Sequence, residues 1–398
     1  MIACANPNFL FPKRSNMPSL RPEIDPDGLL EYSVVFTDRA LNHMSQRFQR
    51  VMRDVSEVLK EVYHARSAIV VPGSGTFGME AVARQFATNR RTLVIRNGWF
   101  SYRWTQIFET GKIPAAQTVL QARPVAPGRQ APFEPPAAQE VAAAIRKERP
   151  EVVFAPHVET AAGIILPESY LRTVAQAVRE VGGLFVLDCI ASGAIWVDMR
   201  DAGVDVLVSA PQKGWTGSPC SAFVMLSERA RAAIDGTAST SYAADLGKWL
   251  QIMEAYEGGG HAYHSTMPTD ALARTRDAML ETRAYGFEKL RAAQLELGQR
   301  VRALLADRGL RSVAASGFQA PGVVVCYTDD DGLHTGKAFL GAGLQAAAGV
   351  PLRCDEPADF KTFRIGLFGL DKLYDVDRTV ANLDVALGRI LGPSAAQR

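Results

Sequence analysis

The sequence has little net charge, no closely spaced cysteine pair and no long apolar run, and each absence excludes a class of protein. In 398 residues, 44 basic residues balance 42 acidic ones to a net charge of +2, so we expect no nucleic-acid partner. None of the five cysteines belongs to a C-x-x-C pair, which argues against a disulfide framework or a metal site. No stretch reaches the ~20 apolar residues of a membrane span, and residues 1–15 lack a signal-peptide core. We therefore expect a cytoplasmic protein without membrane contact.

Short apolar runs alternate with helical patterns over the first two thirds of the chain. The runs have the length of buried strands and lie at 68–71, 92–95, 152–155, 184–187 and 204–208. Such alternation predicts an α/β fold with a mostly parallel sheet that is covered on both faces. A long helical segment, 269–305, then leads to strands near 322–327 and 362–367, which indicate a second, smaller domain.

A single lysine, Lys213, follows the apolar run 204–208 within Ser-Ala-Pro-Gln-Lys-Gly-Trp-Thr-Gly-Ser, residues 209–218. The carboxyl ends of strands are where open α/β sheets bind ligands. Partial burial lowers a lysine pKa, and a neutral amine forms a Schiff base with a carbonyl group. A solvated lysine on a turn is the plain alternative for this segment taken alone.

Other chemically useful residues also follow predicted strands, so they are expected to meet Lys213 in one crevice. They are the glycine-rich turn 73–76, the aromatic Phe100, the hydroxyl of Thr160 and the carboxylate of Asp188. A phosphate-binding turn, a stacking ring, a carboxylate and a lysine fit pyridoxal 5'-phosphate, whose ring acts as an electron sink when its nitrogen is protonated. Each residue also has a structural explanation: Asp188 as a helix cap, Phe100 as core, and His157 and Glu159 as buried hydrogen-bonding groups.

The glycine-rich turn also matches the dinucleotide-binding pattern G-x-G-x-x-G at Gly73–Gly78. That pattern expects an acidic residue at the end of the next strand. The strand ends instead in Arg96-Asn97-Gly98, which disfavours NAD, although an arginine suits NADP. A nicotinamide-dependent dehydrogenase therefore stays a distant alternative.

With these motifs in order, the chain resembles the class V aminotransferases of fold type I, specifically the alanine–glyoxylate and serine–pyruvate aminotransferase group. The motifs that carry the resemblance span nearly the whole chain: residues 41–45, 73–76, 97–100, 157–160, 187–192, 212–213, 263–266 and 363–367. The resemblance implies a large domain, 26–275, with a mostly parallel seven-stranded sheet, and a smaller α/β domain, 276–398. It also implies that residues 1–25 pack on the active site and the small domain.

The resemblance further implies a role for each matching residue. Lys213 looks like the Schiff-base lysine, Asp188 like the partner of the pyridine nitrogen, and Arg364 like the arginine that binds the substrate carboxylate. Phe100 and Ile190 occupy the positions on the two faces of the cofactor ring. The remaining cofactor-binding positions are Ser74, Gly75, Thr76, Thr160 and Gln212, with Tyr263 and Thr266 reaching the neighbouring subunit of a homodimer.

Two stretches depart from the family pattern. A Pro-Gly-Pro run common in the family is replaced by Pro12-Lys-Arg-Ser-Asn16, which puts Ser15 and Asn16 among the substrate-binding candidates. Lys13 and Arg14 there suit a second acidic group on the substrate, or simply face solvent. Where the family has Glu-Thr-Ser-Thr-Gly, this chain has Glu159-Thr-Ala-Ala-Gly163, so Thr160 is the remaining hydroxyl for the cofactor ring.

We therefore expect a pyridoxal-phosphate-dependent aminotransferase that moves an amino group from a small amino acid, such as alanine or serine, to glyoxylate or pyruvate. A lyase or a cysteine desulfurase on the same fold is the alternative enzyme, with Cys354 as the candidate thiol. A catalytically inactive cofactor-binding module is the alternative outside enzymes. The presence of Lys213, Asp188 and Arg364 together argues against it.

Overall fold

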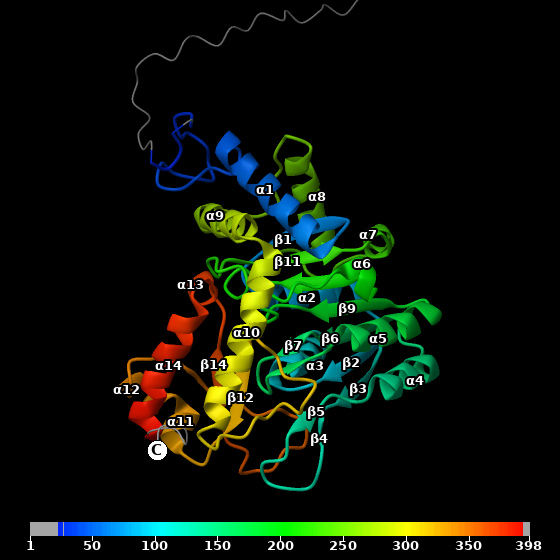
Figure 1. Cartoon of the computed structure of the whole chain (residues 1–398). Coiled ribbons are helices and arrows are strands. Elements are labelled where there is room, and N and C mark those ends of the chain that lie inside the picture. The colour runs from blue at the N-terminus through cyan, green and yellow to red at the C-terminus, as the bar shows by residue number, and fades with distance from the viewer. Residues whose placement is uncertain (1–22, 27, 393–398) are drawn as a thin grey trace, which may run out of the picture.

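The computed structural model describes residues 23–26 and 28–392, and its centre is a seven-stranded sheet (Figure 1). The strands, in spatial order, are β1 (Ser67–Pro72), β11 (Ser221–Leu226), β10 (Val206–Ser209), β9 (Leu184–Asp188), β6 (Val152–Pro156), β2 (Arg91–Arg96) and β3 (Ala116–Gln121). Every pair from β10 to β3 is parallel, whereas β11 runs antiparallel to both β1 and β10. The mostly parallel seven-stranded sheet expected from the sequence is confirmed.

Helices cover both faces of this sheet, and all residues of its strands β6, β10 and β11 are therefore buried. α2 (Gly75–Phe86) packs against β10 and β11, α3 (Trp99–Gly111) against β2 and β6, and α5 (Glu168–Glu180) against β9. The other helices of this part are α1 (Gln46–Tyr63), α4 (Ala138–Glu148), α6 (Met199–Ala202), α7 (Glu228–Ile234) and α8 (Leu246–Glu257).

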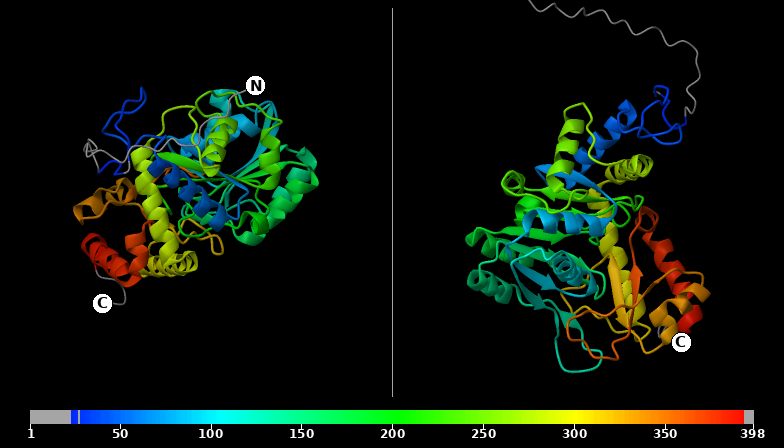
Figure 2. Two further views of the ribbon diagram at one scale, coloured as in Figure 1. Left: turned by 90° about the horizontal axis from the view of Figure 1, so that it is seen from above. Right: turned by 180° about the vertical axis from the view of Figure 1, so that it is seen from behind.

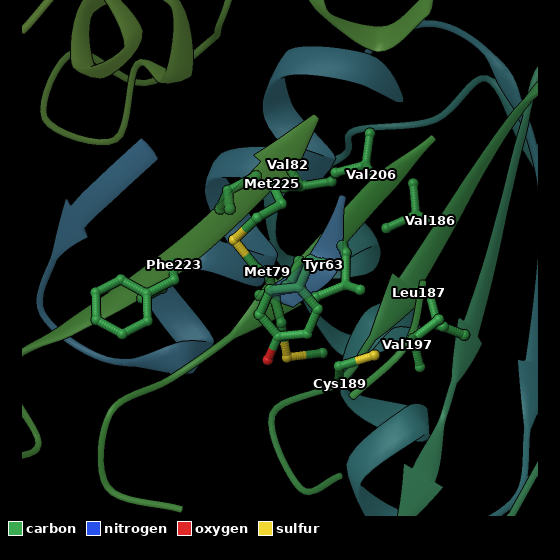
Figure 3. Close-up of a cluster of buried hydrophobic side chains, with 14 of the residues drawn as sticks. Tyr63, Met79, Val82, Val186, Leu187, Cys189, Val197, Val206, Phe223 and Met225 are labelled. Atoms are coloured by element: carbon green, nitrogen blue, oxygen red, sulfur yellow. The ribbon is translucent and has the colours of Figure 1, made fainter. Parts of the chain in front are cut away.

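The helix that follows the glycine-rich turn approaches the sheet closely. α2 begins at Gly75, directly after Ser74 of the turn. Gly73 has φ +118°, a backbone conformation that side chains disfavour, and a Cβ on Gly78 would lie 2.4 Å from Ala222 Cβ. Met79 and Val82 of α2 reach into the core beside Phe223, Met225 and the β9 and β10 valines (Figure 3). This packing fixes the first turn of α2 at the carboxyl edge of β10.

A second, smaller sheet lies across helix α10 from the large one (Figures 1 and 2). Its strands are antiparallel, in the order β12 (Val323–Tyr327), β14 (Thr362–Gly366) and β13 (Ala347–Ala348). The long helix expected over 269–305 is two helices, α9 (Thr269–Tyr285) and α10 (Phe287–Ala306), because Gly286 between them takes φ +107° and breaks the helical path. The remaining helices of this part are α11 (Asp331–Thr335), α12 (Lys337–Gly341), α13 (Leu370–Tyr374) and α14 (Val376–Leu391).

Two short hairpins complete the described residues: β4 (Arg123–Pro124) with β5 (Phe133–Glu134), and β7 (Val158–Glu159) with β8 (Ile164–Ile165). No helix within residues 23–26 and 28–392 is both long and apolar enough to cross a membrane. Ser15, Asn16, Lys13 and Arg14 lie outside the described residues, as does nearly all of the segment expected at 1–25.

Candidate active site

Asp188 is the last residue of β9, so the sheet itself positions it. Register pairing places it between Pro156 of β6 and Val208 of β10. Its carboxyl group is buried, and Oδ1 accepts the backbone N–H of Ile190 at 2.9 Å. Burial raises the pKa of Asp188 to about 7; the nearby Glu159 adds to this rise and Arg103 opposes it. A cationic group bound beside Asp188 would restore its ionised form.

The first turn of α2 lies next to Ile190. Ser74 caps this helix with extended backbone, and its side chain makes no capping hydrogen bond. Gly75 brings the backbone so close to Ile190 that a Cβ would lie 2.6 Å from Ile190 Cδ1. The turn therefore leaves backbone N–H groups and hydroxyls at a helix N-terminus, where anions bind favourably. Ile190 therefore connects the two: its side chain packs on Gly75 of this turn, and its backbone N–H donates to Asp188.

Phe100 stands in the first turn of α3, and the buried carboxylate of Glu159 fixes that turn. Glu159 accepts hydrogen bonds from the backbone N–H groups of Phe100 at 3.3 Å and Ser101 at 2.9 Å, and from the Ser101 hydroxyl at 2.7 Å. The Ala161 N–H donates a further bond at 2.9 Å. Burial raises the pKa of Glu159, while these donors oppose the rise. Glu159 is therefore a structural anchor that decides where the Phe100 ring lies.

Two arginines contact the Phe100 ring. The Arg103 guanidinium carbon lies 5.2 Å from the ring centroid and that of Arg364 lies 5.5 Å from it, both within the range of cation–π contact. Arg103 Nη1 also donates to Thr76 Oγ1 at 3.0 Å, which ties α3 to the first turn of α2. Arg364, on β14, donates Nε–H to the Ala348 carbonyl at 2.8 Å. Burial lowers the pKa of Arg364, with Glu159 opposing.

Lys213 lies on the connection between β10 and β11 and is half-buried. Its Nζ lies 5.4 Å from the Phe368 ring centroid. Burial lowers the pKa of Lys213, and the positive charge of Arg364 lowers it further. Gly214 packs so tightly on Gly193 that a Cβ would lie 2.2 Å from the Gly193 oxygen, which holds the connection in place. The structure therefore presents a restrained amine whose lowered pKa brings the neutral, nucleophilic form closer than it is for a lysine in water.

The other expected site residues divide into two groups. Gln212 precedes Lys213, and its buried Oε1 has no hydrogen-bond partner among the described residues. Thr160 is half-buried directly after Glu159, and its side chain makes no hydrogen bond within the described part of the chain. Tyr263 and Thr266 lie apart, on the segment between α8 and α9; both are exposed, and their hydroxyls lie 3.1 Å from each other.

Three residues of this site were not assigned to it from the sequence: Arg103, Phe368 and the anchor Glu159. Arg103 follows Phe100 by three residues, which is the spacing of side chains on one face of a helix. That signal exists only once α3 is known, and α3 was not expected. Phe368 lies in the loop after β14, and no motif in the sequence marks it.

Comparisons with known proteins place this arrangement in a family. The chain matches the model of the class V aminotransferase family over residues 29–320. It is 30% identical over 353 residues to a 2-aminoethylphosphonate–pyruvate transaminase of Paraburkholderia phymatum, covering 86% of this chain and 88% of that protein. It is 28% identical over 271 residues to alanine–glyoxylate aminotransferase 1 of Saccharomyces cerevisiae, covering 63% of this chain and 66% of that protein.

The fold points the same way. The crystal structure of ureidoglycine–glyoxylate aminotransferase from Bacillus subtilis superimposes with a TM-score of 0.70 at 22% identity, covering 89% of this chain and 90% of that one. The protein is thus a fold type I enzyme with a second, smaller sheet packed beside the large one. More narrowly, the chain belongs to the class V aminotransferases. It is a transaminase whose cofactor is pyridoxal 5'-phosphate and whose substrates are amino and oxo acids.

Proposed function

We propose that this transaminase moves the amino group of a small amino acid, such as alanine or serine, to pyruvate or glyoxylate, with Lys213 as the residue that holds the cofactor covalently. The observation that carries the proposal is the half-buried amine of Lys213, whose pKa is lowered by burial and by Arg364 at the same sheet edge as Asp188. An amine in that state attacks a carbonyl carbon and later accepts a proton. The partly buried guanidinium of Arg364 supplies the binding group for an acidic substrate.

The residues present fit the cofactor. Gly75 leaves a space beside Ile190 that a Cβ would fill, and Gln212 Oε1 is a buried polar atom without a partner among the described residues, so its amide is free to turn toward a bound group. We assign the phosphate to Ser74, Gly75, Thr76 and Gln212, the ring faces to Phe100 and Ile190, the ring nitrogen to Asp188 and the ring oxygen to Thr160. Bound there, the cofactor accepts the electron pair released at the substrate Cα and carries the amino group between half-reactions.

Asp188 and Lys213 divide the proton chemistry between them. Burial raises the pKa of Asp188 even with Arg103 opposing, and a pyridinium N–H beside the carboxylate would be stabilised as an ion pair in a buried place. With the cofactor bound, the Lys213 amine would act as the base that removes the substrate Cα proton. A bound pyridinium would favour the ionised form of Asp188, and burial shifts Lys213 toward its neutral form.

Arg364 is the proposed partner of the substrate carboxylate. Its Nε–H is occupied by the Ala348 carbonyl, which fixes the planar group and leaves the terminal nitrogens for a ligand. A guanidinium fork binds both oxygens of a carboxylate in one plane. Its position over Phe100 supports this role, because an acidic group bound there would lie beside the proposed place of the cofactor ring.

A second candidate donor is 2-aminoethylphosphonate. It is favoured by the 30% identity over most of the chain to a transaminase named for that substrate. A phosphonate offers oxygens to the same guanidinium as a carboxylate does, but its anionic group lies one bond farther from the amine-bearing carbon. The two donors therefore require different distances between the reacting carbon and Arg364, and turnover distinguishes them directly.

The desulfurase alternative finds no support in the position of Cys354. A desulfurase needs a mobile thiolate, whereas Cys354 is 2% exposed and its Sγ donates to the carbonyl oxygens of Arg96 and Leu352. Burial raises the pKa of this thiol, which suppresses the thiolate. Cys354 therefore acts as a packing residue between the 350–356 loop and β2.

We further propose that the working form is a homodimer in which Tyr263 and Thr266 reach the phosphate of the neighbouring subunit. Both hydroxyls are exposed in the single chain, and Tyr263 is 52% exposed. Several other large apolar side chains are also exposed: Leu29, Tyr32, Val34, Phe77 and Tyr242. Analytical ultracentrifugation of the full chain at several concentrations tests it, and a monomer that retains full activity contradicts it.

The function is tested by the visible absorbance of the purified protein before and after each donor is added. We expect an absorbance band from lysine-bound cofactor that bleaches with L-alanine, L-serine or 2-aminoethylphosphonate and returns with pyruvate or glyoxylate. Lys213→Ala is expected to abolish turnover while the protein still folds, as checked by circular dichroism. Normal turnover in the Lys213→Ala variant would contradict the proposal. A band that no donor bleaches points instead to a lyase or an inactive cofactor-binding protein.

A further inference from the structure

Arg103 connects three parts of the proposed cofactor site, although it was assigned no role there. It extends from α3 to the first turn of α2, where Nη1 donates to Thr76 Oγ1 at 3.0 Å. Its guanidinium lies 5.2 Å from the Phe100 ring centroid, and its charge is felt at Asp188, whose pKa it lowers against the effect of burial. Helix packing and the Glu159 anchor at the start of α3 set its position.

This guanidinium has no ion-pair partner within residues 23–26 and 28–392. Arg103 is half-buried, and no carboxylate of the described chain lies within ion-pair distance of it. Two other partly buried arginines do have one: Arg276 pairs with Asp54 at 2.9 Å, and Arg308 with Asp384. A cation that has lost part of its hydration without a counter-charge is costly, so such a group normally faces an anion.

The residues assigned to the phosphate supply hydrogen bonds but no full positive charge. Ser74, Gly75, Thr76 and Gln212 are neutral, and the N-terminus of α2 contributes only about half an elementary charge. A phosphate monoester carries about −1.5 to −2 charges near neutral pH. A phosphate at the first turn of α2 therefore needs a cation nearby, and Arg103 is hydrogen-bonded to a residue of that turn.

We propose that Arg103 is the residue that neutralises the cofactor phosphate, binding it directly next to Thr76. The inference rests on the proposed function, which places the phosphate at Ser74–Thr76. The guanidinium presents several N–H donors in one plane, and only the one on Thr76 is used among the described contacts. The same charge favours the ionised form of Asp188, so one side chain would serve both ends of the cofactor.

The test compares two ligands that differ only in the phosphate. Full-length apoprotein is titrated with pyridoxal 5'-phosphate and with pyridoxal, and both dissociation constants are read from the absorbance of the bound aldehyde. We expect Arg103→Gln to weaken pyridoxal-phosphate binding about 10- to 100-fold while pyridoxal binding changes by less than about 2-fold. Arg103→Lys keeps the positive charge but loses the planar guanidinium. Its dissociation constant for pyridoxal 5'-phosphate is expected to lie between those of wild type and Arg103→Gln. Arg300→Gln, at a half-buried arginine of α10 that pairs with Asp377, is the control and should leave both constants unchanged.

The outcomes separate the inference from the function beneath it. Equal weakening of both ligands in Arg103→Gln overturns the inference, because it shows a structural role in holding α2 and α3. Unchanged binding of both also overturns it. If wild-type protein binds neither aldehyde, the proposed function itself fails. Inorganic phosphate should also stabilise the apoprotein against thermal unfolding, which gives a readout without covalent chemistry. This stabilisation should be lost in Arg103→Gln and kept in Arg300→Gln.

Discussion

One carboxylate oxygen of Glu159 holds Ser101 twice, accepting its backbone N–H at 2.9 Å and its hydroxyl at 2.7 Å. The other oxygen accepts the N–H groups of Ala161 and Phe100. A fully buried acidic group therefore joins the β7–β8 hairpin to the first turn of α3. The same helix carries the ring of Phe100 and the guanidinium of Arg103, so the anchor helps to set the geometry of the proposed cofactor site.

The first prediction concerns this anchor. Glu159→Ala leaves buried N–H groups without acceptors and is expected to lower the free energy of unfolding by about 3–5 kcal/mol, measured by urea denaturation of the apoprotein. Glu159→Gln keeps one acceptor oxygen and should lose less. Glu109→Ala, at an exposed position on the same helix, is the control and should change stability by less than about 0.5 kcal/mol. A loss in Glu159→Ala no larger than in this control would contradict the anchoring role.

A second prediction follows from the raised pKa of Asp188. Its folded value of about 7 exceeds the ordinary 3.8, so the folded apoprotein holds the proton more tightly than the unfolded chain. The associated stability is complete below about 3.8 and is lost as pH rises to about 7. Asp188→Asn cannot ionise, so its advantage over wild type should grow from near zero at about pH 4 to a few kcal/mol, at most about 4, at about pH 8. Urea unfolding of both apoproteins across this range measures it.

Adding the cofactor should reverse that order. Wild type then gains the ion pair at the pyridine nitrogen, whereas the neutral amide of the Asp188→Asn variant offers no charge to it, so wild type is stabilised more by saturating pyridoxal phosphate. A difference between the two apoproteins that stays constant with pH would show that Asp188 does not titrate in the folded protein. The same order with and without cofactor would remove Asp188 from the proposed role.

His157 gives a third prediction, of opposite sign. Burial lowers its pKa to about 3 from 6.5, with Arg291 adding to the effect, and its Nδ1 lies 2.7 Å from the Ser192 hydroxyl. The folded protein therefore keeps the ring neutral, and the stability that it contributes is lost as pH falls from about 6.5 toward 3, by about 1.4 kcal/mol per unit. His157→Asn should remove this slope.

Because Asp188 titrates in an overlapping range with the opposite sign, the His157 measurement belongs in the Asp188→Asn background. There, unfolding free energies at about pH 7 and about pH 5 should differ by up to about 2 kcal/mol more in the protein that keeps His157 than in the one that also carries His157→Asn. Parallel curves for the two proteins would mean that the ring is not kept neutral by the fold.

The fourth prediction tests the contact between Gly75 and Ile190. A Cβ at position 75 would lie 2.6 Å from Ile190 Cδ1, so Gly75→Ala must displace that side chain, at a cost of about 1–3 kcal/mol in thermal or urea unfolding. Ile190→Val removes Cδ1 and should recover part of the loss when combined with it. Gly236→Ala, whose added Cβ meets no atom closer than 3.8 Å, is the control. Additive effects of the two substitutions would contradict the contact.

The central strands could be predicted because burial on both faces makes them continuous apolar runs. β3 could not, since this edge strand reads Ala-Gln-Thr-Val-Leu-Gln and none of its residues is fully buried. α3 was not predicted for a related reason: its buried face includes Ser101 and Thr105, so the helical spacing of apolar residues is interrupted. Polar groups replace apolar ones there because Glu159 and Arg96 bind them.

The candidate site was predictable to the same degree. The places of Asp188 and Lys213 could be predicted because one ends a strand and the other lies in the connection after a strand, whereas their catalytic roles stay predictions. Arg103 could not, because its place depends on the rotation of an unrecognised helix. Tyr263 and Thr266 stay predictions, since their proposed target lies on another subunit, and so do the domain limits at 25 and 275. Ser15 and Asn16 stay predictions outside the described residues.

The antiparallel strand β11 has a consequence for the lysine. Parallel neighbours in the sheet need a crossover, whereas β10 and β11 are joined directly by residues 210–220, with Ser209 opposite Phe223 in the ladder. Lys213 therefore lies on a short connection whose two ends are both held by the hydrogen bonds of the β10–β11 ladder. A one-residue insertion there would move the amine by the length of a residue, whereas the same insertion in the exposed 125–130 loop would move nothing in the site. The register of the β10–β11 pair thus fixes the place from which the Lys213 amine extends into the site.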